Sequence, residues 1–231
     1  IITAKPTWQQ MMDKMMAVPT QALQLWFKPD VAGLGWTFWQ KELAFLSTYT
    51  DDPMNTWSDM SDLIIRESWP DNHFPNQIAY YCNEYLQKNF PEMPPPSDHG
   101  YPAEQLALMR ERVLKALKES LPAIFPNAVD EQGEFRWDLL VDPENGLGEE
   151  RLNSQYLRVN MDPTEHYVLS VKGSAEYRLK ADESGFRNMT LTGDWIDNEA
   201  DNGVMNGSYV EGTVLSGMKS SEAVIASLLW D

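Results

Sequence analysis

Cysteine, histidine and basic residues are all scarce in this chain, and each shortage excludes a kind of site. Cys82 is the single cysteine among 231 residues, so the chain has no internal disulfide framework and no cysteine-based metal site. This use of cysteine predicts a reducing, cytoplasmic location. The three histidines lie far apart in the sequence, without the short spacing of metal ligands, so we expect no metal site.

Positive charge is also in short supply. The 18 Lys and Arg residues are outnumbered by 35 Asp and Glu residues, which gives a formal net charge of -17. A nucleic-acid partner requires a basic surface, and anionic membranes disfavour so acidic a chain. No apolar run reaches the roughly 18 residues that a membrane-spanning helix needs. The sequence therefore predicts no nucleic-acid partner and no membrane span.

Familiar motifs of catalysis are missing as well. There is no G-x-S-x-G elbow, and Cys82 lies inside an apolar strand pattern, so a nucleophilic triad is not expected. No pair of carboxylates stands out for glycosidase chemistry. The G-x-G-x-x-G turn of a dinucleotide-binding unit is absent too. The sequence therefore names no catalytic residue.

Hydrophobic periodicity predicts both strands and helices in the first two thirds of the chain. Leu23, Leu25 and Phe27 alternate with other residues and predict a strand at Thr20–Lys28, and Gln77–Tyr85 has a similar pattern. A helix should begin at Pro102 and stop at Pro122, with an apolar face made of Leu106, Met109, Val113, Leu117 and Leu121. We also expect helices at Thr7–Val18 and Trp57–Glu67, an extended connector at Pro91–Pro96, and strands at Ala44–Thr50, Phe125–Asp142, Tyr156–Asn160 and Tyr167–Val171. These elements predict an α/β or α+β fold.

The most informative stretch lies near the C-terminus, from Met189 onward. Met189–Thr192 is expected to form a short strand that runs into a Gly193–Asp194 turn. After an acidic loop, a helix should open near Asn206, with apolar or small residues on one face at Val210, Val214, Met218, Ser221, Ile225 and Leu228. A turn beside a helix start offers free backbone N–H groups to a polar ligand.

This stretch resembles the C-terminal flavin-binding segment of the flavin-containing amine oxidases and their phytoene-desaturase-like relatives. The matching residues are Leu191, Gly193, Asp194 and Trp195, followed by Asn206–Glu211, Gly212, Val214, Ser216 and Gly217. Upstream, the runs Arg158–Val168 and Tyr177–Lys180 resemble the lead-in found in one bacterial branch of that family. The resemblance covers Arg158–Asp231.

The resemblance implies FAD as the cofactor and assigns roles to particular residues. Gly193, Asp194 and Trp195 would bind the cofactor, with the Asp194 carboxylate on the ribityl hydroxyls. The backbone at Ser208, Tyr209 and Val210 would face the pyrimidine end of the isoalloxazine ring. Tyr209 would also face the substrate, as one wall of an aromatic cage.

The same resemblance predicts how the chain is divided. Residues 1–157 would be the region that binds a small-molecule substrate, built as a mixed sheet with flanking helices. Residues 158–231 would be a flavin-contacting segment whose strand–helix pair belongs to an FAD-binding domain. The N-terminal dinucleotide-binding domain is absent, so the chain is expected to be a fragment, a subunit or a truncated relative. Completed by a dinucleotide-binding domain or chain, it would remove hydride from an amine or C–C substrate. The alternative is a non-catalytic binding or interaction module on a truncated flavoprotein fold.

Overall fold

A computed structural model of the protein describes residues 3, 5–36, 45–47, 56–70, 73–85, 97–198 and 209–229. The chain divides into two compact units. We call Pro19–Glu165 the sheet unit, and Ile1–Val18 together with His166–Asp231 the terminal unit. Each unit is described by itself. The division predicted at residues 157 and 158 falls within a strand of the sheet unit, and as a division of roles it stays a prediction.

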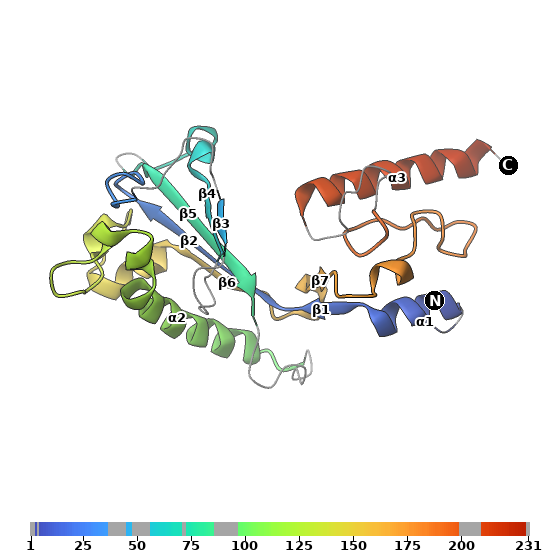
Figure 1. Ribbon diagram of the computed structural model, residues 1–231, viewed down its shortest axis with the longest axis horizontal. Helices are drawn as coiled ribbons and strands as arrows, with labels where there is room; N and C mark the ends of the chain where they lie inside the picture. Colours follow the sequence, from blue (N-terminus) through green and yellow to red (C-terminus); the bar gives the residue numbers. More distant parts are fainter. Residues whose placement is uncertain are drawn as a thin grey trace. The chain divides into compact units, whose positions relative to one another are not determined.

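The sheet unit is built around five strands in the order β3-β4-β5-β2-β6, and each neighbouring pair is antiparallel. Figure 1 shows how they are arranged. Their bounds are β2 (Thr20–Phe27), β3 (Phe45–Ser47), β4 (Thr56–Asp59), β5 (Gln77–Glu84) and β6 (Tyr156–Val159). The fold is therefore α+β, and the prediction of a mixed sheet is wrong. Four of the strands precede the first long helix of this unit, so they pair without the helical crossovers that parallel strands need.

Alternation along β2 places its odd-numbered residues in the core. Leu23, Leu25 and Phe27 are fully buried, and the helix α2 (Tyr101–Glu119) covers this face of the sheet (Figure 1). Burying each such side chain contributes about 1.5–3 kcal/mol. The predicted strands at Thr20–Lys28 and Gln77–Tyr85 are confirmed.

The predicted helix after Pro102 is also confirmed, but its buried face differs in one position. Met109, Val113 and Leu117 lie in the core as expected. Leu106, predicted on that face, is 40% exposed. Gln105 is buried in its place, because its side-chain oxygen accepts a hydrogen bond from the Tyr85 hydroxyl at 3.1 Å.

Several other predicted elements differ from the structure. Thr7–Val18 is not one helix, since α1 (Pro6–Lys14) ends early and β1 (Met16–Val18) pairs antiparallel with β7 (Tyr167–Leu169). Pairing with a distant strand has overridden the local helical pattern there. Trp57–Glu67 is divided between β4 and a 3₁₀ helix. The stretch Phe125–Asp142 forms short 3₁₀ turns and takes part in two isolated bridges, Val129 with Phe135 and Leu140 with Phe27, in place of a strand. The 3₁₀ helices are η2 (Ser61–Arg66), η3 (Leu121–Ala123), η4 (Pro126–Ala128), η5 (Trp137–Leu139), η6 (Gly148–Ser154), η7 (Pro163–Glu165) and η8 (Ala175–Tyr177).

The terminal unit contains α1, β1, β7, η8 and the long helix α3 (Val210–Leu229). Its small core consists of Met11, Leu179, Ala181, Leu191 and Ile196. The predicted strand at Met189–Thr192 is wrong: Leu191 makes single hydrogen bonds to Ala181 and to the Ser220 hydroxyl, so no ladder forms. The predicted C-terminal helix is confirmed from Val210 onward.

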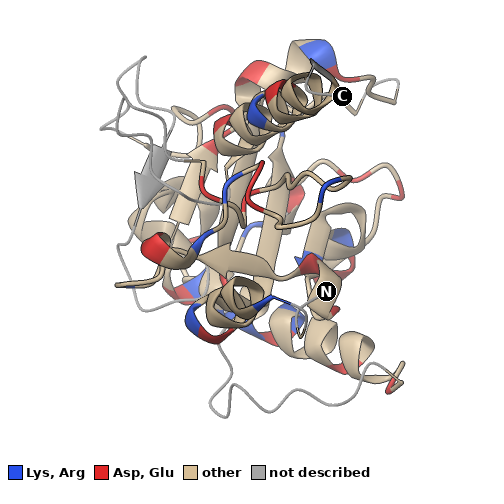
Figure 2. Cartoon of the chain, turned by 90° about the vertical axis from the view of Figure 1, so that its right-hand side faces the viewer, with Lys and Arg blue, Asp and Glu red and all other residues tan. Residues whose placement is uncertain are grey.

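Charged residues of both signs are distributed over the chain. Acidic residues are scattered over the cartoon, with Lys and Arg among them (Figure 2). None of the helices in the described ranges is long and apolar enough to cross a membrane. The predicted connector Pro91–Pro96 lies outside the described residues.

Candidate functional site

The turn that carries Gly193, Asp194 and Trp195 has a geometry that requires glycine at its first position. Gly193 has a φ of +124°, and a Cβ added there would lie 2.6 Å from the Trp195 Nε1 atom. The Trp195 ring also packs against Trp8, with ring centroids 6.0 Å apart. The indole is thus folded back over the glycine, and any side chain at position 193 would displace it.

Arg178 fixes the same turn from the inside. Its guanidinium is buried at 4% exposure, and Nη1 donates hydrogen bonds to the Asp194 carbonyl at 2.5 Å and the Ile196 carbonyl at 3.4 Å. Nη2 donates to the Ser170 hydroxyl at 3.3 Å. Burial lowers the pKa of Arg178, while the carboxylates of Asp194 and Asp197 oppose that shift. Arginine nevertheless stays charged at neutral pH, so a buried cation holds the backbone from which the Asp194 carboxylate projects.

The helix α3 holds the turn from the other side through small polar residues. The fully buried Ser216 hydroxyl accepts a hydrogen bond from the Gly193 N–H at 2.6 Å and lies 3.2 Å from the Thr192 hydroxyl. One helical turn later, the Ser220 hydroxyl donates to the Leu191 carbonyl. The Asn198 amide donates to the Gly193 carbonyl at 2.8 Å. The turn and helix predicted from the sequence are therefore brought together.

The start of α3 lies further along the helix from this contact. Val210 is the first helical residue, and at 1.5 Å per residue it is about 9 Å along the axis from Ser216. The Tyr209 carbonyl accepts a hydrogen bond from the Thr213 N–H at 3.1 Å, and the Tyr209 side chain is partly buried. The predicted roles of Tyr209 and Val210 stay predictions. Ser208 lies outside the described residues.

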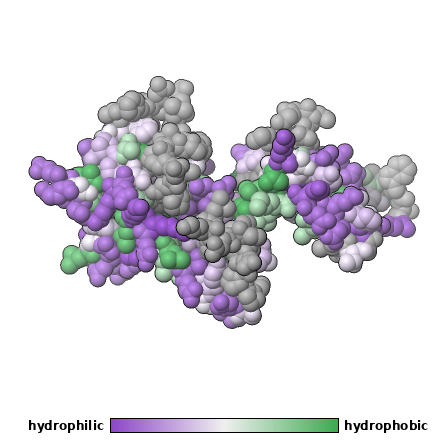
Figure 3. All heavy atoms as spheres, turned by 60° about the horizontal axis from the view of Figure 1, so that its bottom comes forward, coloured by the Kyte–Doolittle hydropathy of each residue, from purple (hydrophilic) through white to green (hydrophobic). Residues whose placement is uncertain are grey.

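Large apolar side chains of α3 face away from the core of its unit. Val210 is 75% exposed and Leu228 is 71% exposed, with Val214, Met218 and Ile225 also exposed between them. We call these five residues the apolar face of α3. Among the coloured residues, the face of the molecule visible in Figure 3 is mostly hydrophilic, with apolar side chains in separate patches. The apolar residues that the sequence places on one face of this helix are therefore exposed.

Arg178 is the residue that sequence reasoning missed. Its run, Tyr177–Lys180, was noted only as part of a lead-in, and nothing in it set this arginine apart from an exposed one. A signal was nevertheless present, because Leu179 and Ala181 on either side of Lys180 are core residues. An arginine in a buried segment needs partners, and carbonyl groups at a turn are suitable acceptors.

The described residues favour neither a metal site nor a nucleophilic cysteine. Among the described residues, no group of three or more His, Cys, Asp or Glu lies close enough to hold a metal ion. Burial raises the pKa of Cys82, opposed by a hydrogen bond with Tyr80, so the thiol is a poor nucleophile at neutral pH.

The turn and the start of α3 offer an acceptor and donors to a polar ligand. A partly exposed carboxylate, at Asp194, accepts hydroxyl hydrogen bonds. The first N–H groups of α3 have no intrahelical partners. Comparison with protein-family models and with curated proteins finds no match for this chain.

Proposed function

We propose that this chain is the substrate-binding and C-terminal flavin-contacting part of an FAD-dependent oxidoreductase of the amine-oxidase type. One observation carries the proposal beyond the sequence resemblance. The Gly193–Trp195 turn is held by Arg178 on one side and by Ser216 on the other, with the Asp194 carboxylate partly exposed. A turn fixed at so many points is preorganised, which lowers the entropic cost of holding a ligand.

Each part of the turn would have a role in holding FAD. The Asp194 carboxylate would accept hydrogen bonds from ribityl hydroxyls, which are stronger than neutral ones because the acceptor is charged. The start of α3, from Ser208 to Val210, carries about half a positive charge. It would therefore stabilise negative charge at the pyrimidine edge of the ring, with Tyr209 toward the substrate. The flavin supplies the chemistry, as acceptor of a hydride from a C–N or C–C bond.

A partner with a dinucleotide-binding domain would complete this site. The chain has no G-x-G-x-x-G turn for the FAD pyrophosphate. The apolar face of α3 gives such a domain a surface to cover, because an exposed stripe of this length marks an interaction site.

The same apolar face favours a second candidate, a non-catalytic interaction module. In that case α3 would bind another protein, and the Gly193–Trp195 turn would serve only to position the helix. Flavin binding separates the two candidates.

The test is retention of FAD, measured by visible absorption after gel filtration, for the chain alone and mixed with a protein that carries G-x-G-x-x-G. Asp194→Asn removes the charge but keeps the size, and we expect it to weaken FAD binding about ten- to a hundredfold, from about 1.5–3 kcal/mol for a charged hydrogen bond. Asp182→Asn, at an exposed position of the same unit, is the matched control. FAD binding that is equal in both variants, or absent in every mixture, would favour the interaction module.

A further inference from the structure

The strand β6 forms one edge of the five-stranded sheet, and its outer side has open backbone groups. The Asn160 N–H donates to the Thr20 carbonyl at 2.8 Å, and Arg158 lies opposite Ala22. Because hydrogen-bonding direction alternates along an antiparallel strand, Tyr156 and Arg158 bond to β2. The N–H and C=O groups of Leu157 and Val159 therefore point outward. Within the described ranges, no other segment makes a hydrogen bond with them.

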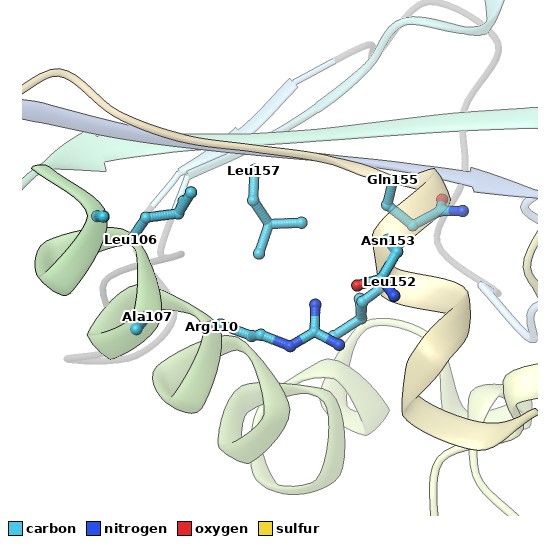
Figure 4. A pocket seen from close by; sticks show the side chains of 8 residues that line it. Leu106, Ala107, Arg110, Leu152, Asn153, Gln155 and Leu157 are labelled. Atoms are coloured by element: carbon cyan, nitrogen blue, oxygen red, sulfur yellow. The ribbon is translucent and has the colours of Figure 1, made fainter.

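Beside this edge, one side of α2 borders open space. Ala103, Leu106, Ala107 and Arg110 share this side of the helix, apart from the residues that pack on the sheet. They line a cavity of about 400 Å³ with Leu152, Asn153, Gln155 and Leu157. Figure 4 shows Leu157 pointing into this space from β6.

A second cavity follows along the same edge. It has a volume of about 300 Å³ and shares Ala103, Leu106 and Leu157 with the first, while Val159 and Met161 line its far end. Neighbouring strands lie about 4.8 Å apart, and their side chains on one face repeat every ~7 Å. A strand placed beside β6 would thus put two alternate side chains beneath α2, one in each cavity.

The charged residues differ between the two cavities. At the first cavity, the Arg110 Nη2 donates to the Glu149 carbonyl at 2.8 Å, and Arg110 forms no ion pair with any described residue. The second cavity is bordered by Asp162 and by Glu165, which pairs with Arg158. The charged group that lines the first cavity is therefore a guanidinium, whereas the second cavity is bordered by two carboxylates and one guanidinium.

We propose that the groove between α2 and β6 binds an extended segment of another polypeptide, which adds to the sheet as a strand antiparallel to β6. The outward groups of Leu157 and Val159 select a strand, because only extended backbone offers donors and acceptors at matching intervals. The two cavities select alternate apolar side chains. The charges select a basic residue at the beginning of the segment, beside Asp162, and an acidic one at its end, beside Arg110. The proposal does not depend on flavin binding.

The probe is a fluorescein-labelled heptapeptide, Lys-Thr-Val-Thr-Leu-Thr-Glu, with an amidated end. Its Val and Leu would lie opposite Val159 and Leu157. We expect saturable binding by fluorescence anisotropy, and slower hydrogen exchange in the backbone segment that contains Leu157 and Val159. A peptide with N-methyl-leucine at the fifth position, which lacks one strand hydrogen bond, should bind at least tenfold more weakly. Exchanging Lys and Glu in the peptide should weaken binding about two- to fivefold, as expected for exposed ion pairs.

Two variants of the full chain test the location. Leu106→Lys places a charge in the groove and should weaken binding at least tenfold. Leu108→Lys is the matched control, because Leu108 is on the same helix and 43% exposed but does not line either cavity. Equal binding by both variants, tight binding of the N-methylated peptide, or no binding at millimolar peptide would each overturn the proposal. A dimer whose Leu157 and Val159 amides are already protected would overturn it too, since a second copy would then occupy the edge.

Discussion

Replacing Arg178 with Met should destabilise the terminal unit substantially. Methionine fills much of the space of the arginine stem but donates no hydrogen bond. The carbonyls of Asp194 and Ile196 and the Ser170 hydroxyl would lose the donor that they share. Of these acceptors only Ile196 is buried, while Asp194 is partly buried and Ser170 is exposed. A buried acceptor left without a partner costs about 1–3 kcal/mol, the other two cost less, and relief of the buried guanidinium offsets part of the total. We expect a net loss of about 1–3 kcal/mol in the free energy of unfolding.

Urea denaturation, followed by hydrogen exchange in the segment 178–198, measures this loss in the terminal unit. Arg187→Met is the control, because Arg187 is an exposed residue of the same unit and surface substitutions usually stay within about 0.5 kcal/mol. The Trp8–Trp195 ring pair should also loosen, which near-ultraviolet circular dichroism detects. If Arg178→Met and Arg187→Met unfold at the same urea concentration with the same slope, the turn does not depend on the guanidinium and the reasoning fails.

Two further substitutions test local geometry by urea denaturation. Gly193→Ala should lower the free energy of unfolding by about 1–3 kcal/mol, because φ is +124° and the new Cβ would lie 2.6 Å from the Trp195 Nε1 atom. Gly173→Ala is the control, since Gly173 is also at positive φ but has no atom within 4 Å of the added Cβ, and it should lower the free energy of unfolding by less. Equal losses would mean that Trp195 is easily displaced. Burial raises the pKa of Asp142, but hydrogen bonds from Ser154 and two backbone N–H groups together bring it below its ordinary value. Its stabilising contribution should therefore be complete above the ordinary value, near pH 4, and be lost as pH falls below it. Asp142→Asn should remove this acid-dependent part of the stability curve, and an unchanged curve would contradict the assignment.

Sequence periodicity predicted the elements whose pattern is set by a large core. The strand β2 has three fully buried residues at every second position, and α2 has buried residues at helical spacing. In both cases the core buries one face more completely than the other, so the local pattern carries the information. The direction of strand pairing does not follow from such a pattern, and the expectation of a mixed sheet came from the family resemblance instead.

Predictions failed where distant segments decide the backbone conformation. Met16–Val18 continues a helical pattern but pairs with Tyr167–Leu169, about 150 residues later in the chain. Met189–Thr192 has strand-like residues, yet its backbone is held by a loop carbonyl and a serine hydroxyl. A single sequence gives no sign of these partners. The Gly193–Asp194 turn was predicted because glycine at positive φ leaves a local signal, whereas Arg178, which holds it, has no such signal.

The two sides of α3 explain why its apolar pattern alone was a poor guide to its packing. Amphipathic helices usually turn their large apolar residues toward their own core. Here Gly212 and Ser216 face inward, where small side chains let the helix approach the turn closely enough for Ser216 to bond Gly193. A large side chain at these positions would hold the helix too far from the turn for that hydrogen bond to form. Val214, Met218 and Ile225 are consequently left on the outer side, where more than half of each side chain stays exposed among the described residues. A helix that packs its small residues against a turn and presents its apolar residues outward is suited to lie between its own unit and a second protein layer. Under the proposed function, a completing dinucleotide-binding domain would be that second layer.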